Sequence, residues 1–173
     1  QTALSHPSFV YENNLPHYKN NERLEFLGDA VLGLIVSEII YEKYPHLPEG
    51  NMTKVRAKVV RESTLARIAK EISLGEMLYL GKGEELTGGR SRSSTLADSL
   101  EALIGAIYID GGLEDATYFI REHFYLEIDK TIRGQPFKDF KSTLQELIQK
   151  KCEKKLFYEV IRETGPDHDK TFT

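Results

Sequence analysis

The chain has 173 residues, of which 40% are hydrophobic and 29% charged, which suits one folded domain or one domain plus a fragment. Its longest apolar run, residues 30–36, is far shorter than the roughly 18–20 residues that cross a bilayer, so we expect no membrane partner. The single cysteine, Cys152, excludes an internal disulfide and a thiolate metal cluster, and it predicts a reducing compartment, the cytoplasm. The net charge of −4 at first argues against a nucleic-acid partner.

The first 133 residues carry the spacing of helices. Apolar residues at three- and four-residue steps predict a central helix over residues 20–44, and Pro45 ends it. A basic amphipathic helix is predicted from about Thr53, and another over residues 63–72 with Ser63 as its N-cap. The glycine-rich residues 81–93 indicate a loop.

A second apolar helix is predicted over residues 96–109, ending at Gly111-Gly112, and a helix over 113–131 follows it. No stretch of this part shows the alternation typical of strands. The sequence therefore predicts an all-α domain over residues 1–133.

The pattern changes after residues 134–138, which have the composition of a linker. Residues 142–145 form a capping-box signature for a helix that runs to about Glu153. A β-rich stretch over 157–161 is broken at 165–168 and resumes at 171–173, which indicates the start of a hairpin. Residues 139–173 are too few to hold a core unaided, so we expect a truncated second module.

Acidic residues occupy one face of the central helix. Glu22, Glu25 and Asp29 stand at positions i, i+3 and i+7, and at 3.6 residues per turn they project within about 60° of one another. On the second apolar helix, Asp98 and Glu101 are the only acids between residues 95 and 109. Unpaired carboxylates on apolar helices are costly, so a positive charge should lie against both lines.

Two interpretations of these acids are open from spacing alone. Facing lines of carboxylates would form an all-oxygen site, which selects Mg²⁺ or Mn²⁺, and paired hard cations are a recurring apparatus for phosphodiester hydrolysis. The chain lacks a Glu-x-x-His motif, which disfavours a di-iron carboxylate bundle. The alternative is that the acids form structural ion pairs with arginines of neighbouring helices.

Residues 21–30, Asn-Glu-Arg-Leu-Glu-Phe-Leu-Gly-Asp-Ala, resemble the signature of the ribonuclease III family, endonucleases that cut double-stranded RNA. The resemblance extends to His6-Pro7-Ser8, to Pro48-Glu49-Gly50 at the family's spacing, and to residues 96–105 as the second acidic helix. It covers residues 1 to about 133 in order. The resemblance implies the all-α ribonuclease III endonuclease fold.

The resemblance also implies roles for particular residues. Mg²⁺, with Mn²⁺ as a substitute, would be held by Glu25, Asp98 and Glu101. Asp29 and Glu101 would be catalytic. The supporting acidic positions lining the cleft would be Glu22 and Glu49.

The same resemblance implies an obligate homodimer. Phe26 matches the aromatic residue that inserts into a socket on the partner subunit. The two sites of such a dimer would each cut one strand of the RNA.

The residues expected to face RNA lie in two places. Arg90 and Arg92 flank glycines, and such flexible arginines can track a phosphate backbone. Residues 139–173 resemble the first part of a double-stranded-RNA-binding domain of α-β-β-β-α order. The resemblance implies minor-groove contacts by Gln145, Glu146 and His168.

The expected function is that of an Mg²⁺-dependent endoribonuclease acting on double-stranded RNA. We expect 5′-phosphate ends and short 3′ overhangs, in the processing of ribosomal RNA precursors, messages and other structured RNAs. The alternative from another class is a catalytically silent RNA-binding protein that retains the fold.

Overall fold

The computed structural model describes residues 1–134, 163–164 and 171–172. The chain divides into two compact units, residues 1–135 and 136–173, and each is treated by itself. Within the described part of the first unit, all elements are helices, and one isolated parallel bridge joins Ser5 to Tyr79. The all-α class predicted for this part is therefore confirmed.

The first unit contains α-helices and short 3-10 turns in the following order. They are η1 (Thr2–Leu4), α1 (Pro7–Glu12), η2 (His17–Lys19), α2 (Glu22–Lys43), α3 (Glu49–Val59), α4 (Glu62–Glu71), α5 (Leu74–Met77), α6 (Lys82–Leu86), η3 (Gly89–Ser91) and α7 (Ser93–Arg133). The central helix predicted over 20–44 corresponds to α2.

Two predicted boundaries were wrong, each because of local backbone chemistry, and a third was right. Helix α3 begins at Glu49 rather than near Thr53, because Pro48 takes the extended N-cap conformation and the helix starts directly after it. Helix α4 begins at Glu62, so Ser63 lies inside its first turn and Arg61 is the N-cap. The break predicted at Gly111-Gly112 is confirmed, because Gly112 has a non-helical backbone (φ 74°, ψ −167°) and α7 consists of two helices joined at this kink.

The predicted loop over residues 81–93 contains α6 and η3. Ion pairs support this short helical segment, because Glu84 pairs with Arg92 and Glu85 with Arg90. Helix α6 could not be predicted from the sequence, because helices are predicted from the spacing of apolar residues and these pairs join charged residues.

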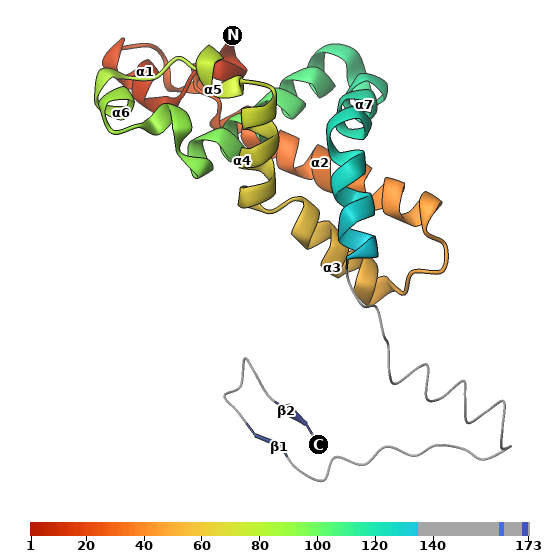
Figure 1. Cartoon of the computed structure of the whole chain (residues 1–173). Coiled ribbons are helices and arrows are strands. Elements are labelled where there is room, and N and C mark those ends of the chain that lie inside the picture. Colours follow the sequence, from red (N-terminus) through yellow and green to blue (C-terminus); the bar gives the residue numbers. More distant parts are fainter. Residues whose placement is uncertain (135–162, 165–170, 173) are drawn as a thin grey trace, which may run out of the picture. The chain divides into compact units, whose positions relative to one another are not determined.

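The core forms where α7 packs against α2 and α4 (Figure 1). Its largest buried side chains come from all three helices, and they include Leu32, Ile35 and Ile39 of α2, Leu65 and Ile68 of α4, and Leu100, Ile104, Ile120 and Phe124 of α7. Burying a side chain of this size contributes about 1.5–3 kcal/mol. Hydrophobic burial therefore fixes α2 against α7, the two helices that carry the acidic residues.

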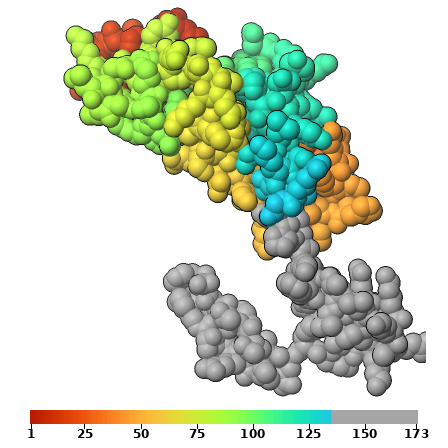
Figure 2. Space-filling view, in the orientation of Figure 1, coloured from red at the N-terminus to blue at the C-terminus, as the bar shows by residue number. Residues whose placement is uncertain are grey.

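The second half of α7 is also tied to α4 at the surface. The Arg67 guanidinium lies 2.6 Å from both Glu71 and Glu127, so one arginine joins a carboxylate of its own helix to one of α7. Figure 2 shows these two helices side by side on one face, α4 in yellow and the end of α7 in cyan. Exposed pairs of this kind contribute little each, but they orient the helix after its bend.

In the second unit, β1 (Glu163–Thr164) pairs antiparallel with β2 (Thr171–Phe172), with Glu163 opposite Phe172. The predicted hairpin is thus present in its described part, although its first strand lies after residues 157–161. The helix predicted from residue 142 lies outside the described residues. Among the described residues, no helix combines the length and the apolar character needed to span a membrane.

Candidate metal centre

Two glycines allow α2 and α7 to cross with their backbones in contact. A methyl group added at Gly28 would overlap the carbonyl oxygen of Glu101, and one added at Gly105 would overlap the carbonyl oxygen of Leu24. Because glycine has no side chain, the two helices can approach more closely than any other residue would allow. The crossing consequently brings the acidic faces of the two helices together.

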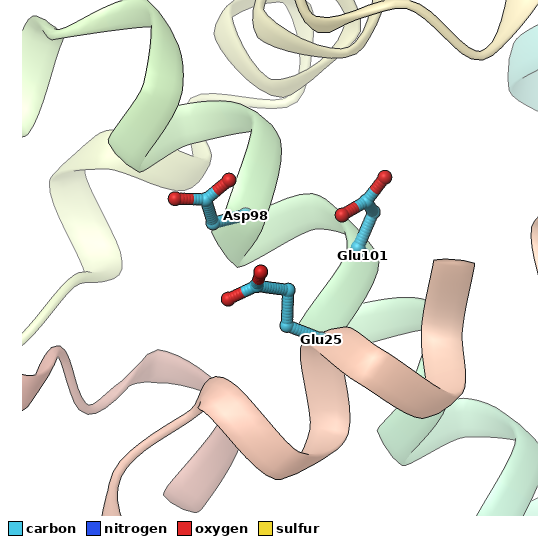
Figure 3. A group of neighbouring side chains, drawn as sticks. All are labelled: Glu25, Asp98 and Glu101. Atoms are coloured by element: carbon cyan, nitrogen blue, oxygen red, sulfur yellow. The ribbon is translucent and has the colours of Figure 1, made fainter. Parts of the chain in front are cut away.

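Three carboxylates converge at this crossing. Glu25 extends from α2, while Asp98 and Glu101 extend from successive turns of α7 toward the same space (Figure 3). One oxygen of each lies within 4.8 Å of the others. We call Glu25, Asp98 and Glu101 the carboxylate cluster.

The carboxylate cluster has no cationic partner in residues 1–134. None of its members makes an ion pair or a side-chain hydrogen bond there, although seven ion pairs exist elsewhere in that part. The interpretation of these acids as structural partners of arginines is therefore wrong for this part of the chain. The positive charge expected against them comes from no described side chain.

The electrostatics of the cluster reflect this lack of compensation. Burial, followed by the charges of Asp29, Glu25 and Asp98, raises the pKa of Glu101 to about 8. Burial also raises the pKa of Glu25, with Asp98 as its largest charged neighbour. Burial and nearby acids thus destabilise the ionised forms of all three carboxylates, and for Asp98 the acid is Glu62 of α4.

The donor set fits a hard divalent cation. All three groups offer carboxylate oxygens, the ligands that Mg²⁺ and Mn²⁺ prefer. The cluster contains no histidine or cysteine, which are the softer ligands that zinc and copper prefer. A bound dication would reverse the destabilisation that raises these pKa values. Glu25, Asp98 and Glu101 are accordingly the residues that could hold the metal.

The other predicted acids lie outside the cluster. Asp29 is exposed on α2, and its charge is the largest charge effect on Glu101. Glu22 accepts a hydrogen bond of 2.7 Å from Asn20 Nδ2, and Glu22 Oε2 lies 3.7 Å from Nε2 of His17.

Glu49 stands apart from the other acids. It is the first residue of α3, it lines a hollow together with Ser37 of α2, and it accepts a hydrogen bond of 3.0 Å from Thr53 Oγ1. At 1.5 Å per residue, Ser37 lies roughly 18 Å along α2 from Glu25. The two supporting acids therefore occupy different surroundings within one chain.

Phe26 lies with its side chain in solvent. It is 81% exposed, and together with Tyr18, Leu27 and Ile109 it lines a hollow of about 740 Å³. The largely exposed Phe26 and the apolar residues Leu27 and Ile109 of the hollow form a contiguous apolar surface, which is typical of a contact site. The hollow has room for an aromatic ring from a second copy.

The predicted RNA-facing arginines both make contacts within the protein. Arg90 donates to Glu85 and to the carbonyl oxygens of Gly75 and Leu78, at 2.6 and 3.0 Å for the two carbonyls. Arg92 pairs with Glu84. Their contact with RNA stays a prediction, as does that of Gln145, Glu146 and His168, which lie outside the described residues.

Two residues near the cluster were missed by sequence reasoning. Glu62, at the start of α4, exerts the largest charge effect on Asp98, and no motif marks it. His6 also acts on Asp98 and is the neighbour that favours its ionised form. The signal for His6 was present, since His6-Pro7-Ser8 was noted as a motif without a role.

Fold and site together define a class: an all-helical domain with an unpaired carboxylate cluster suited to a divalent cation at the crossing of two helices. A family model described as ribonuclease-III-like matches residues 1–128. The chain belongs to the ribonuclease III family.

Individual relatives agree with this assignment. Ribonuclease 3 of Pelotomaculum thermopropionicum is 50% identical over 171 residues, which cover 99% of this chain and 71% of that protein. Ribonuclease 3 of Bacillus licheniformis is 47% identical, with 98% of this chain and 68% of that protein covered.

Solved structures are similar as well. A nuclease domain of ribonuclease III from Campylobacter jejuni, described for flexibility in a region involved in dimer formation, matches with a TM-score of 0.64 and 42% identity. The match covers 71% of this chain and 85% of that one. Dicer from Pichia stipitis matches with a TM-score of 0.51 and 31% identity, covering 80% of this chain and 66% of that one.

Proposed function

We propose that the chain is an endoribonuclease that hydrolyses double-stranded RNA with the help of Mg²⁺, for which Mn²⁺ can substitute. The observation that carries the proposal is the carboxylate cluster, three converging acids without a cationic partner in residues 1–134, in a chain of the ribonuclease III family. A merely structural site would compensate these charges with arginine, as the loop over residues 81–92 does.

In the proposed reaction, Glu25, Asp98 and Glu101 would hold the metal beside the scissile phosphate of the RNA. When bound, Mg²⁺ supplies a Lewis acid that activates water and stabilises the charge developing on the phosphate. Glu101 must release its proton as the ion binds, since its pKa lies near 8 in the free protein. Asp29, exposed beside Glu101, is the second residue to which we assign a catalytic role.

The test uses long duplex RNA, single-stranded RNA of the same sequence, and the full chain. We expect cleavage of the duplex with Mg²⁺ or Mn²⁺, no cleavage with EDTA, and recovery when the metal is restored. Cleavage that persists in EDTA would contradict the metal-assisted reaction.

The rival function is a catalytically silent RNA-binding protein with the same fold. It would bind the duplex in the same assay and leave the RNA intact at every Mg²⁺ concentration. The unpaired acids favour the enzyme, because a silent protein has no need of a costly uncompensated cluster.

We further propose a homodimer anchored by Phe26. Exposure of this ring and the adjacent hollow support the proposal. Burying a phenylalanine contributes about 1.5–3 kcal/mol, and a two-fold dimer buries the ring twice, so Phe26→Ala should weaken the dimer by more than about a hundredfold.

Sedimentation over a range of concentrations measures this change. Leu86→Ala is the matched control, because Leu86 is 86% exposed at the end of α6 and does not line the hollow. A dimer that is equally stable in both variants would reject the anchoring role of Phe26.

The products we propose are duplexes with 5′-phosphate ends and short 3′ overhangs. Water attack with the 3′-hydroxyl as leaving group gives the 5′-phosphate, and paired sites that each cut one strand give the overhang. End analysis of the products checks this, and a 2′,3′-cyclic phosphate would contradict it. We propose ribosomal RNA precursors and messages in the cytoplasm as the substrates.

A further inference from the structure

Helix α3 concentrates positive charge in a domain that is otherwise acidic. Residues 1–134 contain 15 lysines and arginines against 20 aspartates and glutamates, yet four of the cations lie within residues 54–61. The only acid of α3 is Glu49, its first residue. The local charge of this segment is therefore opposite to that of the domain that contains it.

The exposed residues of α3 form two flanks, one on either side of its buried valines. Arg56 donates a hydrogen bond of 3.1 Å to Ser37 Oγ, so its flank faces α2. At 3.6 residues per turn, Lys54 and Lys58 project within about 40° of each other and roughly 160° away from Arg56. The two lysines therefore lie on the flank that faces away from α2.

No described acid pairs with the lysines of this flank. Lys54 is exposed and Lys58 is half-buried, and neither makes an ion pair within residues 1–134. Arg61, which is exposed at the corner between α3 and α4, makes none there either. By contrast, Arg90 and Arg92 each have a glutamate partner. We call Lys54, Lys58 and Arg61 the basic flank.

The backbone of the basic flank is fixed within the helical unit that carries the carboxylate cluster. Helix α3 packs against both α2 and α7, the two helices of the cluster. The hydroxyl of Thr64 donates to the carbonyl of Lys58 at 3.2 Å. The backbone N–H groups of Thr64 and Leu65 donate to the carbonyl of Arg61 at 2.9 and 3.2 Å, so the corner into α4 is held as well. The three cations therefore project from a defined surface rather than from a free loop.

We propose that the basic flank binds backbone phosphates of the RNA duplex whose scissile phosphate lies at the carboxylate cluster. The inference rests on the proposed function. Charge complementarity favours RNA as the partner, because a duplex is a dense polyanion that an acidic domain repels except at such a surface. Contacts of lysine and arginine with phosphate supply affinity without reading the bases. A chain with a net charge of −4 can in this way hold a polyanion next to its acidic site.

Three variants separate the basic flank from its surroundings. Lys54→Gln/Lys58→Gln removes two charges of the flank and keeps side chains that suit a helix. Lys70→Gln/Lys130→Gln is the control with the same change in net charge, since both lysines are exposed, on α4 and α7, and make no ion pair in the described part of the chain. Arg56→Gln is the control on α3 itself, because it removes a charge from the flank that faces α2.

The first measurement is binding of each full chain to a duplex RNA in EDTA, by fluorescence anisotropy, between about 50 and 200 mM salt. EDTA prevents the metal-assisted cleavage, so that only binding is measured. The logarithm of the association constant should fall linearly with the logarithm of the salt concentration, and its slope should be smaller by about one for each lost phosphate contact. We therefore expect Lys54→Gln/Lys58→Gln to reduce the slope by about two for each chain that contacts the duplex, equally for duplexes of different sequence. Both controls should keep the wild-type slope.

The second measurement is single-turnover cleavage with Mg²⁺, alongside thermal unfolding. Lys54→Gln/Lys58→Gln should need more RNA to reach its half-maximal rate and should cleave at the wild-type rate when RNA is saturating, because the carboxylate cluster is unchanged. Its unfolding midpoint should match that of the wild type, since neither lysine has an ion-pair partner in the described residues.

A wild-type salt slope in Lys54→Gln/Lys58→Gln overturns the proposal. An equal loss of slope in Lys70→Gln/Lys130→Gln also overturns it, since net charge alone would then explain the effect. If the wild-type chain binds the duplex with the expected dependence on the basic flank and does not cleave it with Mg²⁺, the proposed enzymatic function fails while the RNA contact stands. Failure of the contact is thereby distinguished from failure of the function.

Discussion

One group of carboxylates lies in the loop before α7 and another lies where α2 crosses α7, and they differ in how their charge is balanced. In the loop, Glu84 is paired with Arg92 and Glu85 with Arg90, so each acid has a guanidinium of its own. In the carboxylate cluster, the three acids face one another and no described cation faces them. The same chain therefore compensates one acidic group internally and leaves the other to an external charge.

The difference appears in the proton affinities. Hydrogen bonding to Arg90 lowers the pKa of Glu85, whereas burial and neighbouring acids raise the pKa of Glu101 to about 8. The number of acidic residues alone carries no information about function, because paired and unpaired acids count alike in the composition. A structural carboxylate has a cationic side chain next to it, whereas a carboxylate that binds a metal ion has none.

The largest difference between the two groups is expected when one acid of each group is replaced by its neutral amide. Glu101→Gln should reduce cleavage of duplex RNA by more than about a hundredfold, since it removes a metal ligand rather than a group that orients one. It should leave the metal-free protein folded at pH 8 and at least as stable as the wild type, because a buried, uncompensated acid is removed. Single-turnover cleavage and thermal unfolding in EDTA measure the two effects.

Glu85→Gln is the matched control. It removes the exposed ion pair with Arg90 and should lower the stability only slightly, with Mn²⁺ affinity unchanged. If both substitutions weakened Mn²⁺ binding equally, the distinction between compensated and uncompensated acids would fail.

A smaller but still large effect is expected from separating the helices that hold the cluster. Gly28→Ala places a methyl group against the backbone of Glu101, which cannot move as a side chain could, so the helices must part. We expect a loss of about 1–3 kcal/mol in the free energy of unfolding, together with weaker Mn²⁺ binding.

Gly33→Ala offers the control on the same helix, because a methyl group there meets open space. Replacing this glycine within α2 should stabilise the protein by about 1 kcal/mol through helix propensity, with Mn²⁺ binding unchanged. Urea unfolding and Mn²⁺ titration distinguish the two variants. Similar behaviour of both would show that direct contact of α2 with α7 does not build the site.

The sequence was sufficient to predict how the acidic residues are arranged along each separate helix. Helical spacing placed Glu25 and Asp29 on one face of α2 and marked Asp98 and Glu101 as out of place on an apolar helix. Spacing within a helix says nothing about which residues of two different helices meet. The contact of Gly28 with α7 decides that, and it places Glu25 inside the cluster and Asp29 beside it.

The short elements were harder to predict for the same reason. Helix α6 is supported by ion pairs between residues up to eight positions apart, and apolar periodicity does not reveal such pairs. The break inside α7 was predictable, because Gly111-Gly112 interrupts the apolar pattern and Gly112 takes a non-helical backbone. Long periodic helices and a glycine break were therefore predictable, whereas a short helix supported by side-chain pairing was not.

The smallest expected effect concerns pH, and it follows from the sign of the pKa shift of Glu101. In the folded chain this group holds its proton up to about pH 8, whereas in the unfolded chain it releases it near pH 4.5. Between these values the folded state binds more protons, so the free energy of unfolding of the metal-free protein should fall as pH rises.

His6 acts in the opposite direction below pH 6.5, because its pKa is lowered in the folded state and deprotonation there favours folding. The fall should therefore be clearest between pH 6.5 and 8, above the range in which His6 opposes it and below the folded-state pKa of Glu101. Urea unfolding in EDTA across this range measures the slope, which Glu101→Gln should flatten. Saturating Mg²⁺ should reverse the trend by binding only the folded state, and its stabilisation should grow with pH as the ligands ionise. A slope that Glu101→Gln leaves unchanged would mean that the compensated acids, not the carboxylate cluster, govern the response to pH.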